Sequence, residues 1–346
     1  MNGLTIQYQG QTVHILDLMR HIITHEAAAH YSPWFKTYYA DLTGERYMSR
    51  YVRFLEKLVA LYPGGVAGRT VLDAGCGFGI MSVLLALMGA HEVQALDCHQ
   101  GMIETFRAYL DILPFELPVH PRLGDVAALS YDDGAFDLVI VHEAISHFND
   151  VDRFLAEAHR VLRPGGGLII SDSNNALHAP TARHTRELWQ AFERGPSGST
   201  VQGHLIERSF VDQRADIIAR EYPQIAPGDA TALAEHTSGL WDEGLRQAIE
   251  GFLQTGILPP HEYRADQCPV DPVQGYYIEQ LFQPFDLKRK IEAVGFRVSL
   301  RAYLGGARGG ALTIANEWLT RPAFSPLTLR LARSFRLLAI KRDSRD

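Results

Sequence analysis

The chain has 346 residues, 46% of them hydrophobic, and a formal net charge of −7 at neutral pH. This length and composition allow one large domain, or a domain with a big insertion, around a sizeable core. The acidic balance disfavours nucleic acid as the main partner, because phosphate binding needs a concentrated positive surface. No basic run long enough to supply one precedes the C-terminal segment.

The cysteine pattern disfavours a disulfide framework and a structural zinc site. The three cysteines, Cys76, Cys98 and Cys268, contain no CxxC pair, so a reducing cytoplasm is the expected location. We expect no signal peptide, because the N-terminus lacks a basic region followed by an apolar one. We also expect no metal, since His21 and His25 lie one helical turn apart without a third ligand set.

The N-terminal region is predicted to be mainly helical. Residues 4–16 alternate weakly and predict a short hairpin, whereas 16–30 and 45–62 have apolar residues at helical spacing. The aromatic-rich stretch 31–47 fits a lid over a ligand, an interface, or plain helix packing. We therefore expect residues 1–66 to form a helical cap or lid.

From residue 70 onward, strands alternate with helices. Such alternation predicts a parallel sheet covered by helices on both faces, and apolar runs such as DLVIV suit strands buried on both sides. The predicted core domain is 67–173. The expected strands are 71–74, 92–96, 119–123, 136–141 and 168–171, and the expected helices are 80–88, 102–110 and 151–162.

This alternation of strands and helices stops after residue 173 and resumes near the end of the chain. Residues 174–283 are too long for a loop and predict an inserted, mainly helical substrate cap. A helix at 287–294 and strands at 296–303 and 334–341 then complete the core sheet, which assigns 284–346 to the core.

The segment 327–336 carries Arg330, Arg333 and Arg336 beside leucines at helical spacing. This pattern predicts a basic amphipathic helix, which can lie on a membrane surface or connect two elements with a solvated face. The acidic chain as a whole disfavours tight membrane anchoring.

Residues 71–79, VLDAGCGFG, join a strand to a helix through three glycines. Gly75, Gly77 and Gly79 remove side chains and permit positive φ where the backbone must approach a ligand. The following helix directs free N–H groups and a partial positive charge at that ligand. The spacing is GxGxG after Asp73, and so differs from the GxGxxG of dinucleotide-binding loops.

Two acidic positions follow at the ends of the next strands. Asp97 ends the second strand, where a carboxylate can accept hydrogen bonds from both ribose hydroxyls. Asp125 and Val126 follow the third strand, where a carboxylate and a backbone group can meet an adenine amine.

In this order and spacing, the chain resembles the small-molecule branch of the class I S-adenosylmethionine-dependent methyltransferases. The resemblance implies a doubly wound α/β fold. Its seven-stranded sheet would be mostly parallel, with an antiparallel last strand beside the fifth, and a helical cap would be inserted. Residues 1–66 and 174–283 are not explained by it. The matching motifs are VLDAGCGFG (71–79), ALD (95–97), GDVAAL (124–129), FDLVIVHEAISHF (136–148) and HRVLRPGGGLIISD (159–172).

The resemblance further implies S-adenosylmethionine as the cofactor and S-adenosylhomocysteine as its product. The glycine loop would hold the methionine and ribose, Asp97 the ribose hydroxyls, and Asp125 with Val126 the adenine edge. His142 would line the site near the sulfonium, and Cys98 would lie near the adenine. The residues so assigned are Asp73, Gly75, Cys76, Gly77, Gly79, Asp97, Cys98, Asp125, Val126 and His142.

Candidate catalytic residues follow the fourth strand, in VHEAISHF. Methyl transfer is an in-line displacement that often requires removal of one proton. His147 is the first choice as general base because histidine titrates near neutral pH, and His142 and Glu143 are the alternatives. The competing interpretation is that His147 packs under the next helix and Glu143 is a solvated loop residue.

We therefore expect a methyltransferase that acts on a small-molecule acceptor, with O-methylation of a hydroxyl as the leading reaction. Nitrogen and carbon acceptors remain open, as does a cofactor-binding protein without catalytic activity. A dehydrogenase is the least supported alternative. The acceptor's identity is not predicted, and a homodimer remains open.

Overall fold

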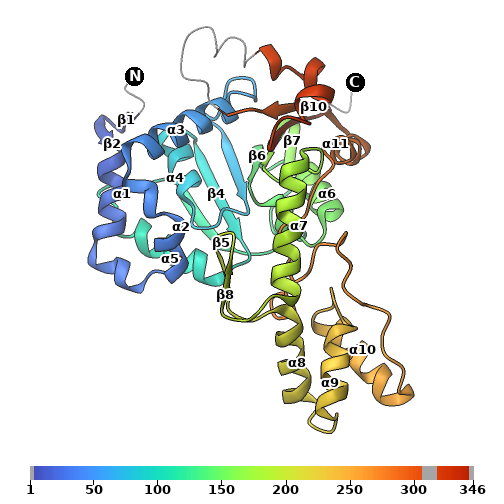
Figure 1. Cartoon of the computed structure of the whole chain (residues 1–346). Coiled ribbons are helices and arrows are strands. Elements are labelled where there is room, and N and C mark those ends of the chain that lie inside the picture. Colours follow the sequence, from blue (N-terminus) through green and yellow to red (C-terminus); the bar gives the residue numbers. More distant parts are fainter. Residues whose placement is uncertain (1–3, 306–317, 343–346) are drawn as a thin grey trace. The chain divides into compact units, whose positions relative to one another are not determined.

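The computed structural model describes residues 4–305 and 318–342 (Figure 1). The chain divides into two compact units. The first unit contains the sheet, and the second is made largely of the segment between β7 and α11. The first comprises Met1–Ile145, Asp150–Asp172 and Pro284–Asp346, and the second comprises Ser146–Asn149 and Ser173–Gln283.

A seven-stranded sheet, in the order β10-β11-β7-β6-β3-β4-β5, forms the centre of the first unit. Neighbouring strands from β5 to β7 are parallel, and β11 is antiparallel to both β7 and β10. The predicted fold class and the antiparallel last strand beside the fifth are thus confirmed. The strands are β3 (Thr70–Ala74), β4 (Glu92–Asp97), β5 (Val119–Leu123), β6 (Phe136–His142), β7 (Leu162–Asp172), β10 (Phe296–Tyr303) and β11 (Ser334–Lys341).

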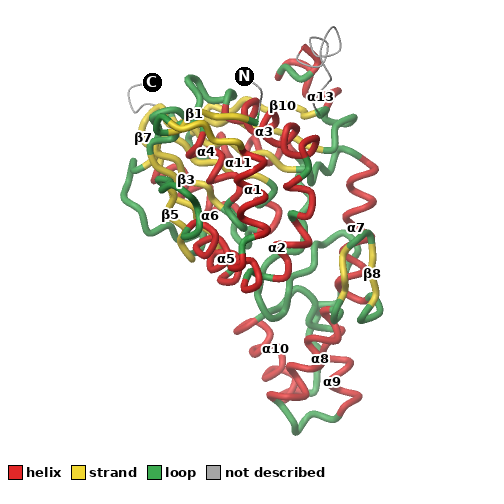
Figure 2. Tube along the Cα trace, turned by 90° about the vertical axis from the view of Figure 1, so that its left-hand side faces the viewer, coloured by secondary structure: helices red, strands yellow, loops and turns green. Residues whose placement is uncertain are grey.

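Burial explains why these segments form interior strands. Phe136–Val141 of β6 is buried at every position, as expected for a parallel strand that is covered on both faces. Figure 2 shows the yellow strands lying among red helices. The helices of this unit are α1 (Ile15–Thr24), α2 (Pro33–Tyr38), α3 (Glu45–Val59), α4 (Ile80–Leu87), α5 (Gln100–Leu110), α6 (Val151–Val161), α11 (Pro284–Ala293) and α13 (Ser325–Thr328).

The N-terminal helices share one hydrophobic core with the sheet. Met19 of α1 and Leu55 of α3 belong to the same buried cluster as Phe106 of α5 and Ile140 of β6. The predicted hairpin before them is also present, as β1 (Thr5–Tyr8) paired with β2 (Gln11–His14).

The prediction of a basic amphipathic helix over 327–336 is wrong. Helix α13 ends at Thr328, and β11 begins at Ser334. The strand predicted at 334–341 is confirmed. Because β7 and β10 flank it on both sides, it gains two ladders of backbone hydrogen bonds, which outweigh the helical spacing of the arginines. Arg336 is therefore a strand residue, with only 6% of its surface exposed.

Among the described helices, none is both long enough and apolar enough to cross a membrane.

The second unit is mainly helical and has its own small core. Ile218, Leu233 and Ile249 pack together within it. The buried side chains of Arg214 and Glu193 form an ion pair at 2.5 Å, and Arg214 Nε donates to the Ala234 carbonyl at 2.8 Å. Because Glu193, Arg214 and Ala234 belong to three different helices, these bonds connect the three. Its elements are α7 (Ala179–Arg194), β8 (Ser199–Val201), β9 (His204–Ile206), α8 (Phe210–Glu221), α9 (Pro227–Glu235) and α10 (Asp242–Thr255).

Candidate functional site

The predicted cofactor residues gather at one edge of the sheet. The glycine loop follows β3, Asp97 ends β4, Asp125 follows β5 and His142 ends β6, and these four strands are neighbours. Their carboxyl ends meet at the same edge because the strands are parallel. Open α/β sheets bind ligands at this edge, where the strand order reverses.

The glycine loop adopts the conformation that its sequence predicts. Gly75, Gly77 and Gly79 have φ values of 77°, 54° and 74°. The backbone N–H groups of Gly75 and Cys76 both donate to the Leu96 carbonyl, at 2.8 and 3.0 Å, and so tie the loop to the end of β4. Gly79 is the residue from which α4 begins, so the N-terminus of that helix faces the same edge.

Asp97 is braced by two backbone amides. Its Oδ2 accepts from Gly77 N at 2.8 Å, and its Oδ1 accepts from His99 N at 2.8 Å. Each carboxylate oxygen keeps a further lone pair for a ligand hydroxyl. Asp97 can therefore order the glycine loop and bind a ribose at the same time.

The next strand end is joined to Asp97 through its backbone. Gly124 N donates to the Asp97 carbonyl at 3.0 Å. Asp125 is exposed, and its Oδ1 accepts from Ala127 N at 2.8 Å. Cys98 is exposed beside Asp97, whereas Cys76 is buried, and burial raises the pKa of the Cys76 thiol well above its ordinary value. Cys76 is thus a protonated thiol that fills space in the loop.

Asp73 is a fully buried carboxyl at the end of β3. Ser82 Oγ donates to its Oδ2 at 2.5 Å, while its Oδ1 has no partner within the described part of the chain. Burial raises the pKa of this carboxyl to about 7, a shift that the nearby Asp97 reinforces and the Ser82 hydrogen bond opposes. A buried acceptor without a partner, facing the glycine loop, fits a ligand that carries a cation or a donor.

The raised pKa of Asp73 predicts a pH-dependent stability. Between the unfolded carboxyl's pKa and about 7, the folded protein holds more protons than the unfolded chain, so this group lowers stability as pH rises. Asp73→Asn should raise the free energy of unfolding of the ligand-free protein by about 1–3 kcal/mol at pH 8 and by much less at pH 5. Urea unfolding at both pH values measures this. The exposed Asp125→Asn variant is the control, and an equal effect of Asp73→Asn at both pH values would contradict the assignment.

His142 lies at the end of β6 against the aromatic side of α3. Its ring centroid is 4.7 Å from that of Phe54, and burial lowers the pKa of its imidazole, which is therefore neutral at pH 7. Tyr51, one turn earlier in α3, has a phenol whose pKa is raised well above its ordinary value by burial, with Asp73 and Glu143 contributing. Sequence reasoning predicted α3 but missed Tyr51 and Phe54, because helical periodicity does not reveal which strand ends a helix will cover.

The candidate catalytic residues are distributed over both units. His142 and Glu143 belong to the first unit, and Glu143 is an exposed residue with a φ of 49°. His147 belongs to the second unit, where its Nδ1 lies 3.0 Å from the Tyr277 carbonyl oxygen. A carbonyl can only accept, so Nδ1 carries the proton, and Nε2 of the neutral ring keeps its lone pair.

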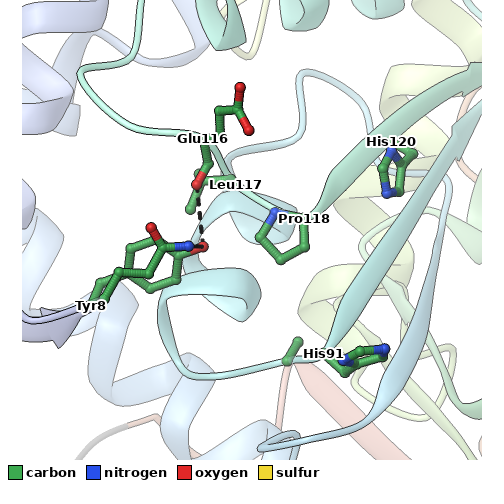
Figure 3. Close-up of a pocket in the computed structure, with 8 residues that line it drawn as sticks. Tyr8, His91, Glu116, Leu117, Pro118 and His120 are labelled. Atoms are coloured by element: carbon green, nitrogen blue, oxygen red, sulfur yellow. Dashed lines mark hydrogen bonds between the residues drawn. The ribbon is translucent and has the colours of Figure 1, made fainter.

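Each unit also contains a cavity. The one in the first unit, of about 550 Å³, is lined by residues such as Tyr8, His91 and Pro118 (Figure 3). His91 and Pro118 directly precede β4 and β5, so this cavity lies at the amino ends of the strands, opposite the glycine loop. The cavity in the second unit has a volume of about 440 Å³ and is lined by Trp189, Tyr277 and other residues of that unit.

Comparison with known proteins supports the same interpretation. Residues 72–170 match the family described as Methyltransferase domain. A Mycolicibacterium smegmatis protein named as a probable S-adenosylmethionine-dependent methyltransferase is 36% identical over 35% of this chain and 47% of its own length. The 2-methyl-6-phytyl-1,4-hydroquinone methyltransferase of a Synechocystis species is 31% identical over 55% of this chain and 58% of its own length.

A third relative is covered more fully. The demethylmenaquinone methyltransferase of Renibacterium salmoninarum is 30% identical over 50% of this chain and 73% of its own length. The chain thus spans about half the length of the first two relatives and most of the third. Together, the glycine loop, the strand order and these matches show that the chain belongs to the class I S-adenosylmethionine-dependent methyltransferases.

Proposed function

We propose that this protein transfers the methyl group of S-adenosylmethionine to a hydroxyl oxygen of a small molecule. The observation that carries the proposal is the arrangement at the carboxyl edge of the sheet. There, the positive-φ glycine loop and the carboxylate of Asp97 are joined by a 2.8 Å hydrogen bond. Two relatives are named for a hydroquinone and for demethylmenaquinone, which supports a small-molecule acceptor.

The cofactor would lie along this edge. Asp97 would accept from the ribose hydroxyls, and the turn at Asp125 and Val126 would contact the adenine. Asp73 and the glycine loop would hold the methionine part, where the positive charges of the ammonium and sulfonium favour an ionised Asp73. His142, neutral and tilted against the ring of Phe54, would line the methyl-transfer site without placing a second positive charge near the sulfonium.

His147 is the base that we propose for the acceptor hydroxyl. Its Nδ1–H is held by the Tyr277 carbonyl, which leaves Nε2 as the proton acceptor. Tyr277 also lines the cavity of the second unit, so the same backbone segment would orient the base and border a space for the acceptor. The segment 174–283 would then act as the substrate cap.

His147→Ala should lower the methyl-transfer rate by about 10²–10⁴-fold, the usual contribution of a general base. Affinity for S-adenosylhomocysteine should remain at the wild-type level, because His147 lies outside the loop and strand ends assigned to the cofactor. Single-turnover rates and calorimetric titration measure the two quantities. His204→Ala, an exposed histidine of the same unit, is the matched control, and a wild-type rate in His147→Ala would assign the base to another residue.

The proposed function itself is tested in two steps. Calorimetry with S-adenosylmethionine, S-adenosylhomocysteine and NADH should show binding of the two adenosyl compounds only. Incubation with methyl-labelled S-adenosylmethionine and a panel of phenols, aliphatic alcohols and amines should then release S-adenosylhomocysteine and label the hydroxyl compounds. Label on nitrogen or carbon instead would correct the acceptor atom, and binding without any transfer would favour a non-catalytic role.

A further inference from the structure

A row of polar residues crosses the sheet of the first unit near its carboxyl edge. In the strand register, Arg301 pairs with Arg336, Arg336 with Ser171, and Ser171 with His142. Residues paired in this way project from the same face of a sheet, with neighbouring strands about 4.8 Å apart. A buried arginine, a hydroxyl and an imidazole therefore lie side by side on the face that α3 covers.

Arg336 is the unusual member of this row. Its guanidinium carbon lies 3.7 Å from the ring centroid of Tyr303 and 4.6 Å from that of Phe54. The aromatic faces attract the positive charge, and Tyr303 also forms a side-chain hydrogen bond with the guanidinium. Nε and Nη2 of Arg336 are buried and have no hydrogen-bond partner among the residues the structure describes.

The two Arg336 nitrogens without a partner, Nε and Nη2, are the pair with which an arginine binds an oxyanion side-on. Nε–H and the outer Nη2–H lie on one edge of the planar guanidinium and together can donate to both oxygens of a carboxylate or phosphate. Ser171 Oγ and His142 Nδ1, from the same row, are likewise buried and without a partner in the described part of the chain. A buried edge of this kind is costly to leave unfilled.

The positive charge of Arg336 also favours an anionic ligand. Arg336 forms no ion pair with a carboxylate within residues 4–305 and 318–342, although only 6% of its surface is exposed. Burial lowers its pKa to about 10, an effect that Tyr303 opposes, so the guanidinium is still protonated at neutral pH. Tyr303, Phe54 and His142, the rings around this row, each keep part of their surface exposed.

We propose that Arg336, with Ser171 and His142, binds an oxyanion group (a carboxylate or a phosphate) on the acceptor. This inference rests on the proposed function, because it names a chemical class for the molecule that is methylated. The cofactor's own carboxylate is the other source of the same chemistry. However, β11 is the third strand from β3, roughly 14 Å from the glycine loop, so the acceptor fits this position better.

The test compares benzoate and phenyl phosphate with neutral benzamide, by calorimetry, with and without saturating S-adenosylhomocysteine. One anion should bind at least about tenfold more tightly than benzamide, as expected for charge-assisted hydrogen bonds. Arg336→Met should abolish this preference, and Arg336→Lys, which keeps the charge but loses the two-donor edge, should remove most of it. Arg297→Met, an exposed arginine on β10, is the control and should behave as wild type.

Ser171→Ala removes a small hydroxyl and serves as a second variant if Arg336→Met does not fold. It should reduce the preference for the anion about threefold to tenfold. Equal binding of benzamide and both anions, no anion binding up to about 10 mM, or a retained preference in Arg336→Met would overturn the proposal. A loss of S-adenosylhomocysteine affinity in Arg336→Met would show that Arg336 binds the cofactor and not the acceptor. A wild-type protein that binds no S-adenosylhomocysteine would refute the proposed function instead.

Discussion

Asp97→Ala is expected to weaken the binding of S-adenosylhomocysteine by about a hundredfold or more, because two effects combine. The variant loses the carboxylate proposed to accept from the ribose hydroxyls. It also frees Gly77 N and His99 N, each of which donates to Asp97 at 2.8 Å, so the glycine loop loses its brace. Isothermal titration calorimetry measures the affinity, and circular dichroism checks that the sheet is retained.

Asp97→Asn separates these two effects. The amide keeps one acceptor oxygen and can brace one of the two backbone amides, but it lacks the charge. Its affinity should therefore lie between those of the wild type and Asp97→Ala. Unchanged affinity in the folded alanine variant would show that the cofactor does not use this carboxylate.

Gly79→Ala is expected to lower the free energy of unfolding by about 2–5 kcal/mol, the sum of about 1–3 kcal/mol for overpacking a core and about 1–2 kcal/mol for the left-handed backbone. A Cβ on Gly79 would lie 1.8 Å from Cε1 of Phe106, which is fully buried in the core. The φ of 74° adds backbone strain for any residue with a side chain. Urea unfolding followed by tryptophan fluorescence gives the difference in free energy.

Gly77→Ala is the matched comparison from the same loop. Its Cβ would meet only Met102 Sδ, at 3.9 Å, so the cost is the positive φ alone, about 1–2 kcal/mol. The Gly77 variant should therefore remain well folded. If Gly79→Ala lowers the free energy of unfolding no more than Gly77→Ala does, α5 moves aside to accept the added methyl group.

The part of the fold that the sequence predicted best is the part with local signals. The strand DLVIV is apolar at nearly every position because β6 is covered on both faces, and the loop residues of 75–79 stand next to one another in the chain. Asp97 was predictable because it is the last residue of an apolar strand, so its position at the strand's carboxyl end can be read from the sequence. These features depend on residues close together in sequence.

The surroundings of Arg336 show what could not be predicted. The strand at 334–341 was predicted correctly from its alternating apolar residues, such as Phe335, Leu337 and Ala339, which are all buried, but the spacing of Arg336 with Arg330 and Arg333 also fits a helix. The choice between the two patterns depends on β7 and β10, whose partners are fixed only in the folded sheet. For the same reason, neither the contact of Arg336 with Phe54 nor its row with Ser171 and His142 is visible in the sequence.

The position of β11 has a consequence for how the protein is made. This strand fills the interior of the sheet between β7 and β10, yet it leaves the ribosome after the other six strands of that sheet and after the whole second unit. Until Ser334–Lys341 emerges, β7 has an unpaired edge of apolar residues, which is a template for wrong pairing. The sheet is therefore completed only after the second unit has been synthesised, and until then the nascent chain depends on protection of that open edge.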